Sequence, residues 1–438
     1  MARCMRSRRR TFGAEVSVAT LDIVSIQRRV VGVLSSSQVL SGIAYSGTTA
    51  AGGLLVVEIT GSEGLAGLSQ TTGILGAAVF ALPLARMALT SGRRRSLSSG
   101  YAIGAAGAVL VIAGALLRNV LLILLGSLLV GAANATGFQA RYAATDLAPA
   151  GKRGRALSYV VWATTVGGVL GPNLLGVSGS LGQKVGLPLL AGPYVITLVC
   201  LIGASAVIAL LLRPDPFVVA RDLRSAVDVT AASEAARPRL RDGLTHLKRN
   251  PRAMLGVATI AAGHLVMVGV MVMTPVHMRH VDVSLQFIGL VISVHVAGMY
   301  ALSPLVGLAV DRLGRIVVLY SGVVILLAAC VISGLAPADS VPILGLGLFL
   351  LGLGWSCTLI AGSVLVTDST EEVERPAVQG LSDLIMNLAG ALGGVAAGII
   401  VVFGSYGILC AASAVPVVAL AVVAALPACR RDSYTRSG

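Results

Sequence analysis

The sequence predicts an all-α integral membrane protein with twelve transmembrane helices in two pseudo-symmetric six-helix bundles. Of its 438 residues, 56% are hydrophobic and only 12% are charged, and the mean hydropathy is +0.89. A soluble domain carries roughly 25% charged residues. Apolar runs of about twenty residues, long enough to span the hydrocarbon core of a bilayer, recur along the chain. This composition excludes an ordinary soluble enzyme.

Apolar runs between charged or Pro- and Gly-rich punctuation locate the helices. The first bundle, 30–213, is expected to hold helices at 31–56, 64–87, 98–117, 120–142, 157–177 and 191–213. The second bundle, 253–427, is expected to hold helices at 253–277, 285–308, 316–336, 342–365, 378–402 and 404–427. A polar stretch, 214–252, is expected to link the bundles. A basic tail, 1–29, precedes them, with a short amphipathic surface helix at Glu15–Ile26, and a second tail, 428–438, follows.

The positive charges indicate how the chain lies in the membrane. If both termini are cytoplasmic, thirty of the 33 Lys and Arg residues fall in cytoplasmic tails and connections, and only Arg118, Lys184 and Arg279 do not. Such a bias predicts a multi-pass protein of the cell membrane with both tails inside. Insertion and contact with anionic lipid account for the net charge of +14, so no nucleic-acid partner is expected.

The two predicted bundles repeat each other at an offset of 222 residues. The offset superposes Gly92-Arg93 on Gly314-Arg315, Thr145-Asp146 on Thr367-Asp368, Arg153 on Arg375, Gly168 on Gly390 and Gly176 on Gly398. These matches lie in equivalent loops and helices, which indicates a duplication. In such architectures a solute site lies near the midplane between the repeats, and the halves move around it.

The repeated acids and bases predict a cytoplasmic gate. Asp146 and Asp368 each end one helix, and Arg153 and Arg375 each begin the next, so each acid and the following base could form a salt bridge in one state and release it in another. Static surface pairs that orient the loops are the alternative. Arg141 is assigned to the same gate.

The loop Gly307-Leu-Ala-Val-Asp311-Arg312-Leu-Gly314-Arg315 resembles the G-x-x-x-D-R-x-G-R motif of the major facilitator superfamily. The resemblance covers about Arg29 to Pro427, and it implies the major facilitator fold with these loop residues in the gate. In the first half, Ala85, Leu89 and Thr90 replace the Gly, Asp and Arg of the motif, whereas Gly92-Arg93 is retained. That half therefore lacks the acidic latch, and its gating is expected to rest on the arginine run that begins at Arg93, together with Asp146.

Two further places bear on the resemblance. The segment Gly167-Gly-Val-Leu-Gly171-Pro172-Asn-Leu-Leu-Gly176 is similar to the G-x-x-x-G-P-x-x-G-G motif of drug:proton antiporters, which implies efflux. Pro172 removes a backbone donor and predicts a kink. The arginine that the superfamily carries in its fourth helix corresponds here to Ser127, so proton transfer is not expected by that route.

Ionisable groups deep in a membrane are functional candidates, because burying them is costly. His264, His295 and Asp383 are the candidates for proton coupling, and Asn387 lies one turn beyond Asp383 on the same face. Histidine titrates near physiological pH. The alternatives are neutral imidazoles hydrogen-bonded between helices, and a carboxylate held at a helix start by the helix dipole.

Few polar residues are available to line a cavity, which favours an amphiphilic or hydrophobic solute over a sugar. The candidates are Gln38, Tyr45, Gln70, Asn134, Trp355 and Asn387. His277 and His280 lie three apart among methionines, and apolar packing explains them better than a metal site. No metal or cofactor is expected.

The sequence thus predicts a monomeric secondary transporter that exports a small amphiphilic solute, a drug-like compound or metabolite, in exchange for protons. A solute-uptake symporter or uniporter and a non-transporting membrane receptor on the same scaffold are the alternatives. A membrane-bound enzyme is not expected, because dinucleotide, phosphate-loop and zinc-protease motifs are missing from the sequence.

Overall fold

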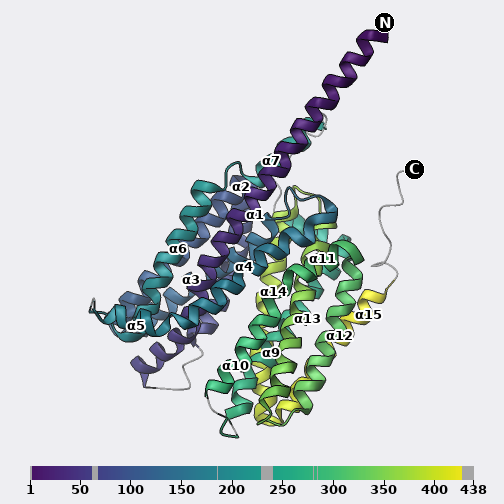
Figure 1. The fold of residues 1–438 in the computed structure, drawn as a ribbon. Helices are drawn as coiled ribbons and strands as arrows, with labels where there is room; N and C mark the ends of the chain where they lie inside the picture. The colour runs from purple at the N-terminus through teal and green to yellow at the C-terminus, as the bar shows by residue number, and fades with distance from the viewer. Residues whose placement is uncertain are drawn as a thin grey trace.

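Two helical bundles lie side by side in the computed structural model, which describes residues 2–61, 68–184, 186–227, 240–279, 281–283 and 285–426 (Figure 1). The N-terminal half holds α1 (Ala2–Thr60), α2 (Leu68–Leu116), α3 (Val120–Ala143), α4 (Arg153–Asn173), α5 (Leu175–Lys184) and α6 (Gly192–Leu211). The C-terminal half holds α9 (Pro251–Arg279), α10 (Leu285–Tyr300), α11 (Ser303–Leu313), α12 (Arg315–Leu335), α13 (Val341–Asp368), α14 (Arg375–Phe403) and α15 (Tyr406–Ala425). Short 3-10 turns lie at Ala150–Lys152 and Leu189–Ala191.

These helices make twelve membrane crossings. Nine described segments are long and apolar enough to cross a bilayer, and one of them, α2, contains two crossings. A straight helix of its 49 residues would be about 74 Å long at 1.5 Å per residue, more than twice the bilayer core. The crossings of α2 meet at Gly92, which has a φ of 85°. Helices α1 and α4, which pack against each other, complete the twelve.

Both halves turn back at equivalent glycines. Gly314 separates α11 from α12 with a φ of 94°, in the left-handed region that glycine adopts without strain, as Gly92 does 222 positions earlier. Helices α10 and α11 together form one crossing. Because the number of crossings is even, α1 enters and α15 leaves at one end of the molecule (Figure 1), here called the terminal end, and the opposite end is the far end.

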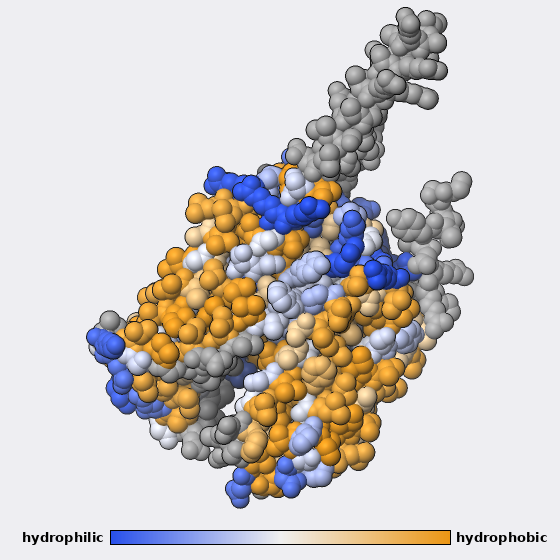
Figure 2. All heavy atoms as spheres, in the orientation of Figure 1, coloured by the Kyte–Doolittle hydropathy of each residue, from blue (hydrophilic) through white to orange (hydrophobic). Residues whose placement is uncertain are grey.

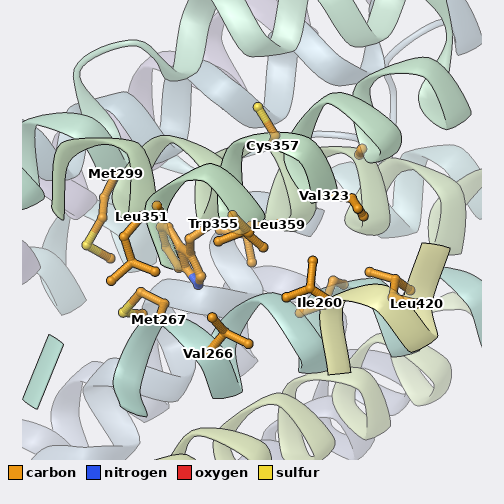
Figure 3. Packing of buried hydrophobic residues seen from close by; sticks show 14 of the residues in the cluster. Ile260, Val266, Met267, Met299, Val323, Leu351, Trp355, Cys357, Leu359 and Leu420 are labelled. Carbon is orange, nitrogen blue, oxygen red and sulfur yellow. The ribbon is translucent and has the colours of Figure 1, made fainter. Parts of the chain in front are cut away.

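The lateral surface of both halves is mostly apolar, as a surface in contact with lipid must be (Figure 2). The largest buried cluster lies mainly in the C-terminal half, where Trp355 and Leu351 of α13 pack near Met267 of α9 and Met299 of α10 (Figure 3), and it continues into Leu157 and Val161 of α4. Smaller clusters fill the N-terminal half. Most of each core thus belongs to one half, and the α4 residues join the C-terminal cluster at the contact between the halves.

The stretch between the halves contains two helices, α7 (Pro216–Val227) and α8 (Leu240–Arg249). Helix α7 contacts α2, and α8 contacts α14. Asp215 accepts a hydrogen bond from the backbone N–H of Arg94 at 2.7 Å, which fixes the start of α7 beside the Gly92 turn. The described parts of this linker are therefore packed on the terminal end.

Candidate gate and solute site between the halves

The halves touch closely at the terminal end. Helix α4 packs on α11 and α2 packs on α14, and these two helix pairs are equivalent to each other under the repeat. A Cβ added to Gly307 would lie 2.6 Å from the carbonyl oxygen of Gly154, so the two backbones are in contact there. At the matching place in the other pair, a Cβ on Gly380 would lie 3.3 Å from the carbonyl oxygen of Ala81. Solute cannot pass where these backbones meet.

Asp311 latches α11 to the start of α4. Its Oδ1 accepts a hydrogen bond from the N–H of Gly154 at 2.8 Å, and its Oδ2 accepts from the N–H of Arg155 at 3.0 Å and from Arg155 Nε at 3.3 Å. The first N–H groups of a helix have no partner within the helix and favour a negative charge. A carboxylate of one half thus caps a helix of the other.

The equivalent place in the other helix pair is apolar on both sides. Leu89 replaces the aspartate and packs with Phe217 and Ala377. Pro376 stands where Gly154 stands in the first half, and proline has no N–H to donate. The α2–α14 contact has therefore lost both members of the latch: the acid of α2 and the backbone N–H of α14 that would donate to it.

Two equivalent ion pairs extend the gate. Arg93 Nε lies 2.8 Å from Asp146 Oδ2, and Arg315 Nη2 lies 2.6 Å from Asp368 Oδ2. Both pairs also reach across to the opposite half: Arg93 Nη2 donates to Gln379 Oε1 at 2.6 Å, and Asp368 pairs with Arg153 as well.

The pairing expected within each loop, Asp146 with Arg153 and Asp368 with Arg375, is wrong for this structure. Each acid turns instead to the arginine that follows the preceding glycine turn, because that arginine lies beside it in space. Arg375 lies 3.2 Å from Glu372 and donates to the carbonyl oxygen of Thr367. Arg312 is exposed at the end of α11.

A buried ion pair joins the halves deeper in the protein. Arg141 Nη2 of α3 lies 2.7 Å from Asp383 Oδ1 of α14, and both side chains are 1% exposed or less. Arg141 Nε also donates to Ser363 Oγ of α13 at 3.2 Å. Arg141 Nη1 and Asp383 Oδ2 have no hydrogen-bond partner in the described part of the chain. Asp383 Oδ2 is thus available to take up a proton, and Arg141 Nη1 is available to donate to a solute.

Aromatic rings from both halves surround this ion pair. The Arg141 guanidinium lies 5.2 Å from the Phe138 ring centroid and 4.7 Å from that of Tyr142. His264 meets the Phe138 ring edge-on at 6.3 Å and accepts a hydrogen bond from Trp355 Nε1 at 3.0 Å. We name the side chains of Phe138, Arg141, Tyr142, His264, Tyr300, Trp355 and Asp383 the central cluster.

Tyr300 completes the central cluster from α10. Its ring lies edge-on to Trp355 at 5.7 Å, and Tyr45 of α1 is close enough to Tyr300 to interact electrostatically. Asn387, one turn after Asp383, donates to the backbone carbonyl of Asp383 at 2.8 Å. Among the sequence candidates, His264, Trp355, Arg141, Asp383 and Asn387 are therefore brought together.

The cluster also contains three residues that the sequence did not indicate: Phe138, Tyr142 and Tyr300. Phe138 and Arg141 are three residues apart on α3, and Tyr142 follows directly, so a search for aromatic residues one turn from Arg141 would have found Phe138. Tyr300 lies on another helix, and only the tertiary structure places it here.

Other candidates lie elsewhere. His295 is buried inside the C-terminal half, with Nδ1 2.8 Å from the carbonyl oxygen of Leu348. This contact joins two helices, as expected for a histidine that packs between helices and does not couple protons. Gln38 accepts a hydrogen bond from the Tyr101 hydroxyl at 3.0 Å within the N-terminal half. Gln70 lines a cavity of about 30 Å³, which has room for about one water molecule. Asn134 is half-buried on α3.

The glycine-proline segment lies at the junction of α4 and α5. Helix α4 ends at Asn173 and α5 begins at Leu175, so the helix is interrupted two residues after Pro172. Gly167 packs on α1, where an added Cβ would lie 2.6 Å from Gly42 Cα. The side chains of Pro172 and its neighbours at 171 and 176 lie outside the described ones.

His277, considered above beside His280, stacks on Tyr406 with centroids 4.4 Å apart, and His280 lies outside the described residues. Within the described ranges, no group of three or more His, Cys, Asp or Glu side chains could hold a metal ion.

Two pseudo-symmetric six-helix halves, closed at one end and joined by a buried ion pair, define a secondary membrane transporter. The chain belongs to the Major Facilitator Superfamily, whose model matches residues 34–284 and 265–436. It is therefore a multi-pass membrane protein that carries a small-molecule solute and is not an enzyme.

Individual relatives support the same assignment. The uncharacterized MFS-type transporter YdeG of Bacillus subtilis is 38% identical over 383 residues, which cover 87% of this chain and 88% of the relative. The riboflavin transporter RfnT of Brucella anthropi is 29% identical over 361 residues, which cover 82% of this chain and 85% of the relative. The human organic anion transporter MFSD10 has the same fold, with a TM-score of 0.70 at 18% identity, over 91% of this chain and 99% of that structure.

Proposed function

We propose that this protein is a proton-coupled transporter that exports a small amphiphilic, aromatic solute by rocking of the two halves about the central cluster. In this proposal the terminal end is cytoplasmic, because the positive charges gather there. The structure then corresponds to a state closed toward the cytoplasm. The protein is proposed to act as a monomer, since each chain contains both halves of the site.

The single observation that carries the proton-coupling proposal is the buried Arg141–Asp383 pair between the halves. A carboxylate inside a membrane protein is costly unless it is paired or protonated. While Asp383 is ionised, it attracts Arg141 of the opposite half. A proton on the unpartnered Oδ2 would remove that attraction, and the halves could then separate at this depth. Protonation and rocking would thereby be linked.

The groups around Asp383 suit this role. Arg141 is its direct partner, and Arg93 lies near enough to interact electrostatically. His264 is also near Arg141, whose positive charge acts on the imidazole. Asp383 is thus the one acid of the central cluster, facing cations from α2 and α3, so its protonation changes the net charge of the contact between the halves.

The rings of the central cluster support an aromatic solute. Phe138, Tyr142, His264, Tyr300 and Trp355 offer ring faces and edges, while Arg141 Nη1 offers a free donor. Aromatic pairs contribute about 0.5–1.5 kcal/mol each beyond the burial of their area. The names of RfnT and MFSD10, a riboflavin transporter and an organic anion transporter, make riboflavin and aromatic carboxylates sensible first probes.

Export is proposed from the glycine-proline segment of α4, which is similar to the motif of drug:proton antiporters. A test is flux into and out of proteoliposomes, with riboflavin, a fluorescent aromatic carboxylate and ethidium as probes and a pH gradient imposed in either direction. Exchange of probe against protons is expected. Movement of probe and protons in the same direction would overturn the export proposal in favour of symport, and binding without flux would favour a receptor.

The site itself is tested with matched tryptophan variants. Trp355→Phe keeps a ring but removes the N–H that bonds to His264, whereas Trp162 lies on α4 with 44% of its surface exposed. We expect Trp355→Phe to weaken probe binding about fivefold, the value of one hydrogen bond, and Trp162→Phe to leave it unchanged. Equal effects of the two variants would place the solute outside the central cluster.

A further inference from the structure

A second cavity, of about 520 Å³, lies at the terminal end of the N-terminal half and away from the central cluster. It is bounded by the first described side chains of α1, the connection between α3 and α4, and the start of α4. Arg28, Lys152 and Arg155 line it together with apolar residues such as Val24, Val31 and Tyr159, and none of the lining side chains that the structure describes is acidic.

The cationic groups of this cavity have nitrogens that bind no other described residue of the protein. The side chains of Arg28 and Lys152 are exposed, and neither forms an ion pair with another described residue. Arg155 uses its Nε for Asp311, while its two terminal nitrogens are not hydrogen-bonded to other described residues. Two cations without an ion-pair partner among the described residues, together with the free terminal nitrogens of Arg155, favour an anionic occupant.

A neutral polar group points to the same conclusion. Gln27, which also lines the cavity, donates from Nε2 to the carbonyl oxygen of Ala144 at 2.7 Å. Its Oε1 is buried and has no hydrogen-bond partner in the described part of the chain. A buried acceptor without a donor costs about 1–3 kcal/mol, and a hydroxyl group of the occupant would satisfy it.

The cavity opens where a lipid headgroup would lie. Tyr159 is 49% exposed on α4 and Val24 is 48% exposed on α1, so apolar surface continues from the cavity onto the side of the bundle. Basic residues at the end of the bundle and an exposed tyrosine are typical of the boundary between headgroups and acyl chains. The occupant must therefore join an anionic head to an apolar body.

We propose that this cavity binds one anionic glycerophospholipid. Arg28 and Lys152 hold its phosphate with the terminal nitrogens of Arg155, Gln27 Oε1 accepts from a headgroup hydroxyl, and an acyl chain follows Val24 and Tyr159. Because Arg155 also pairs with Asp311 of α11, the lipid fixes this arginine in the orientation that latches the terminal end. The bound lipid therefore stabilises the closed terminal end.

Binding is tested by native mass spectrometry of the full chain in detergent, titrated with phosphatidylglycerol or phosphatidylcholine. The variant Arg28→Gln/Lys152→Gln removes two cations from the cavity, and Lys248→Gln/Arg249→Gln removes two exposed cations from α8. We expect the first variant to bind phosphatidylglycerol roughly thirtyfold more weakly and the second to bind like the wild type. Equal loss in both variants, or equal retention of the two lipids, would overturn the proposal.

The effect of the lipid on the Asp311 latch is tested by measuring the distance between the two halves at the terminal end. Thr90 and Arg312 are exposed, equivalent positions at the terminal end of opposite halves, so spin labels at Thr90→Cys and Arg312→Cys report its opening. In nanodiscs, replacing phosphatidylcholine with phosphatidylglycerol is expected to increase the short-distance population of the wild type but not of Arg28→Gln/Lys152→Gln. An equal response of both proteins would contradict the assigned effect. Neither readout requires transport, so the outcome is independent of the proposed solute.

Discussion

At the scale of single residues, equivalent side chains carry different energetic weight in the two halves. The pair Arg93–Asp146 has 1% and 2% exposed side chains, whereas its repeat, Arg315–Asp368, has 23% and 22%. Breaking a buried pair leaves a charge with neither water nor a partner, but an exposed pair contributes little. Duplication therefore produced one structural ion pair and one that water can replace.

The difference in burial between the two ion pairs can be tested by removing the arginine of each pair and comparing the two variants. Arg93→Ala leaves Asp146 buried without its cation and is expected to cost about 3–5 kcal/mol of folding free energy. Arg315→Ala is expected to cost about 1 kcal/mol or less. Thermal unfolding of the purified variants in one detergent measures both. Equal losses of stability would show that burial does not set the value of these pairs.

The residues of the site were only partly predictable. A charge inside an apolar run is conspicuous, so His264 and Asp383 could be proposed from the sequence alone. Their partners could not, because Arg141 and Asp383 are 242 positions apart and meet only when the halves assemble. The sequence offered two partners for Asp146, Arg153 and the arginine run that begins at Arg93, and the fold pairs it with Arg93 in this state.

At the scale of helices, the gate consists of two unlike contacts. Between α4 and α11, the carboxylate of Asp311 caps a helix start across a glycine contact. Between α2 and α14, Leu89 packs on Ala377, and Pro376 has no donor to offer. The α2–α14 contact is also bridged by the Arg93–Gln379 hydrogen bond, but only the α4–α11 contact holds a carboxylate that reaches from one half to the other. Regulation is therefore expected at the α4–α11 contact.

Adding a side chain at this contact tests its role. Gly307→Val places atoms where a Cβ alone would lie 2.6 Å from the Gly154 carbonyl oxygen, so the terminal end should fail to close. Gly289→Val is the control, because its Cβ would have no neighbour within 4 Å. Spin labels at positions 90 and 312 should show a longer distance in Gly307→Val and no change in the control. An unchanged distance in Gly307→Val would contradict the assigned gate.

Helix positions were far more predictable than contacts. Each expected crossing overlaps a described helix, because apolar length is imposed by the bilayer and is directly visible in the sequence. Helices α7 and α8 were not predicted, because the linker sequence is polar and these helices pack on α2 and α14 at the terminal end. The first crossing was expected to begin near residue 31, but α1 begins at Ala2, and no proline separates the tail from the membrane segment.

At the scale of the whole molecule, one closed end and two separately packed halves fit a rocking motion about the central cluster. Most buried residues of each half pack within that half, which fits movement of the halves as two bodies. The terminal contacts hold one state, and the Arg141–Asp383 pair lies deeper, among the aromatic rings of the central cluster. In our account, protonation of this pair is the event that links solute movement to the proton gradient.

Asp383→Asn tests that link most directly. Asparagine keeps the shape of the side chain but cannot carry the proton. In proteoliposomes, using the probe that the wild type transports, we predict that Asp383→Asn loses transport driven by a pH gradient. It should retain exchange of labelled for unlabelled probe at equal pH, because exchange needs rocking but no net proton movement. Full pH-driven transport by Asp383→Asn would contradict the account.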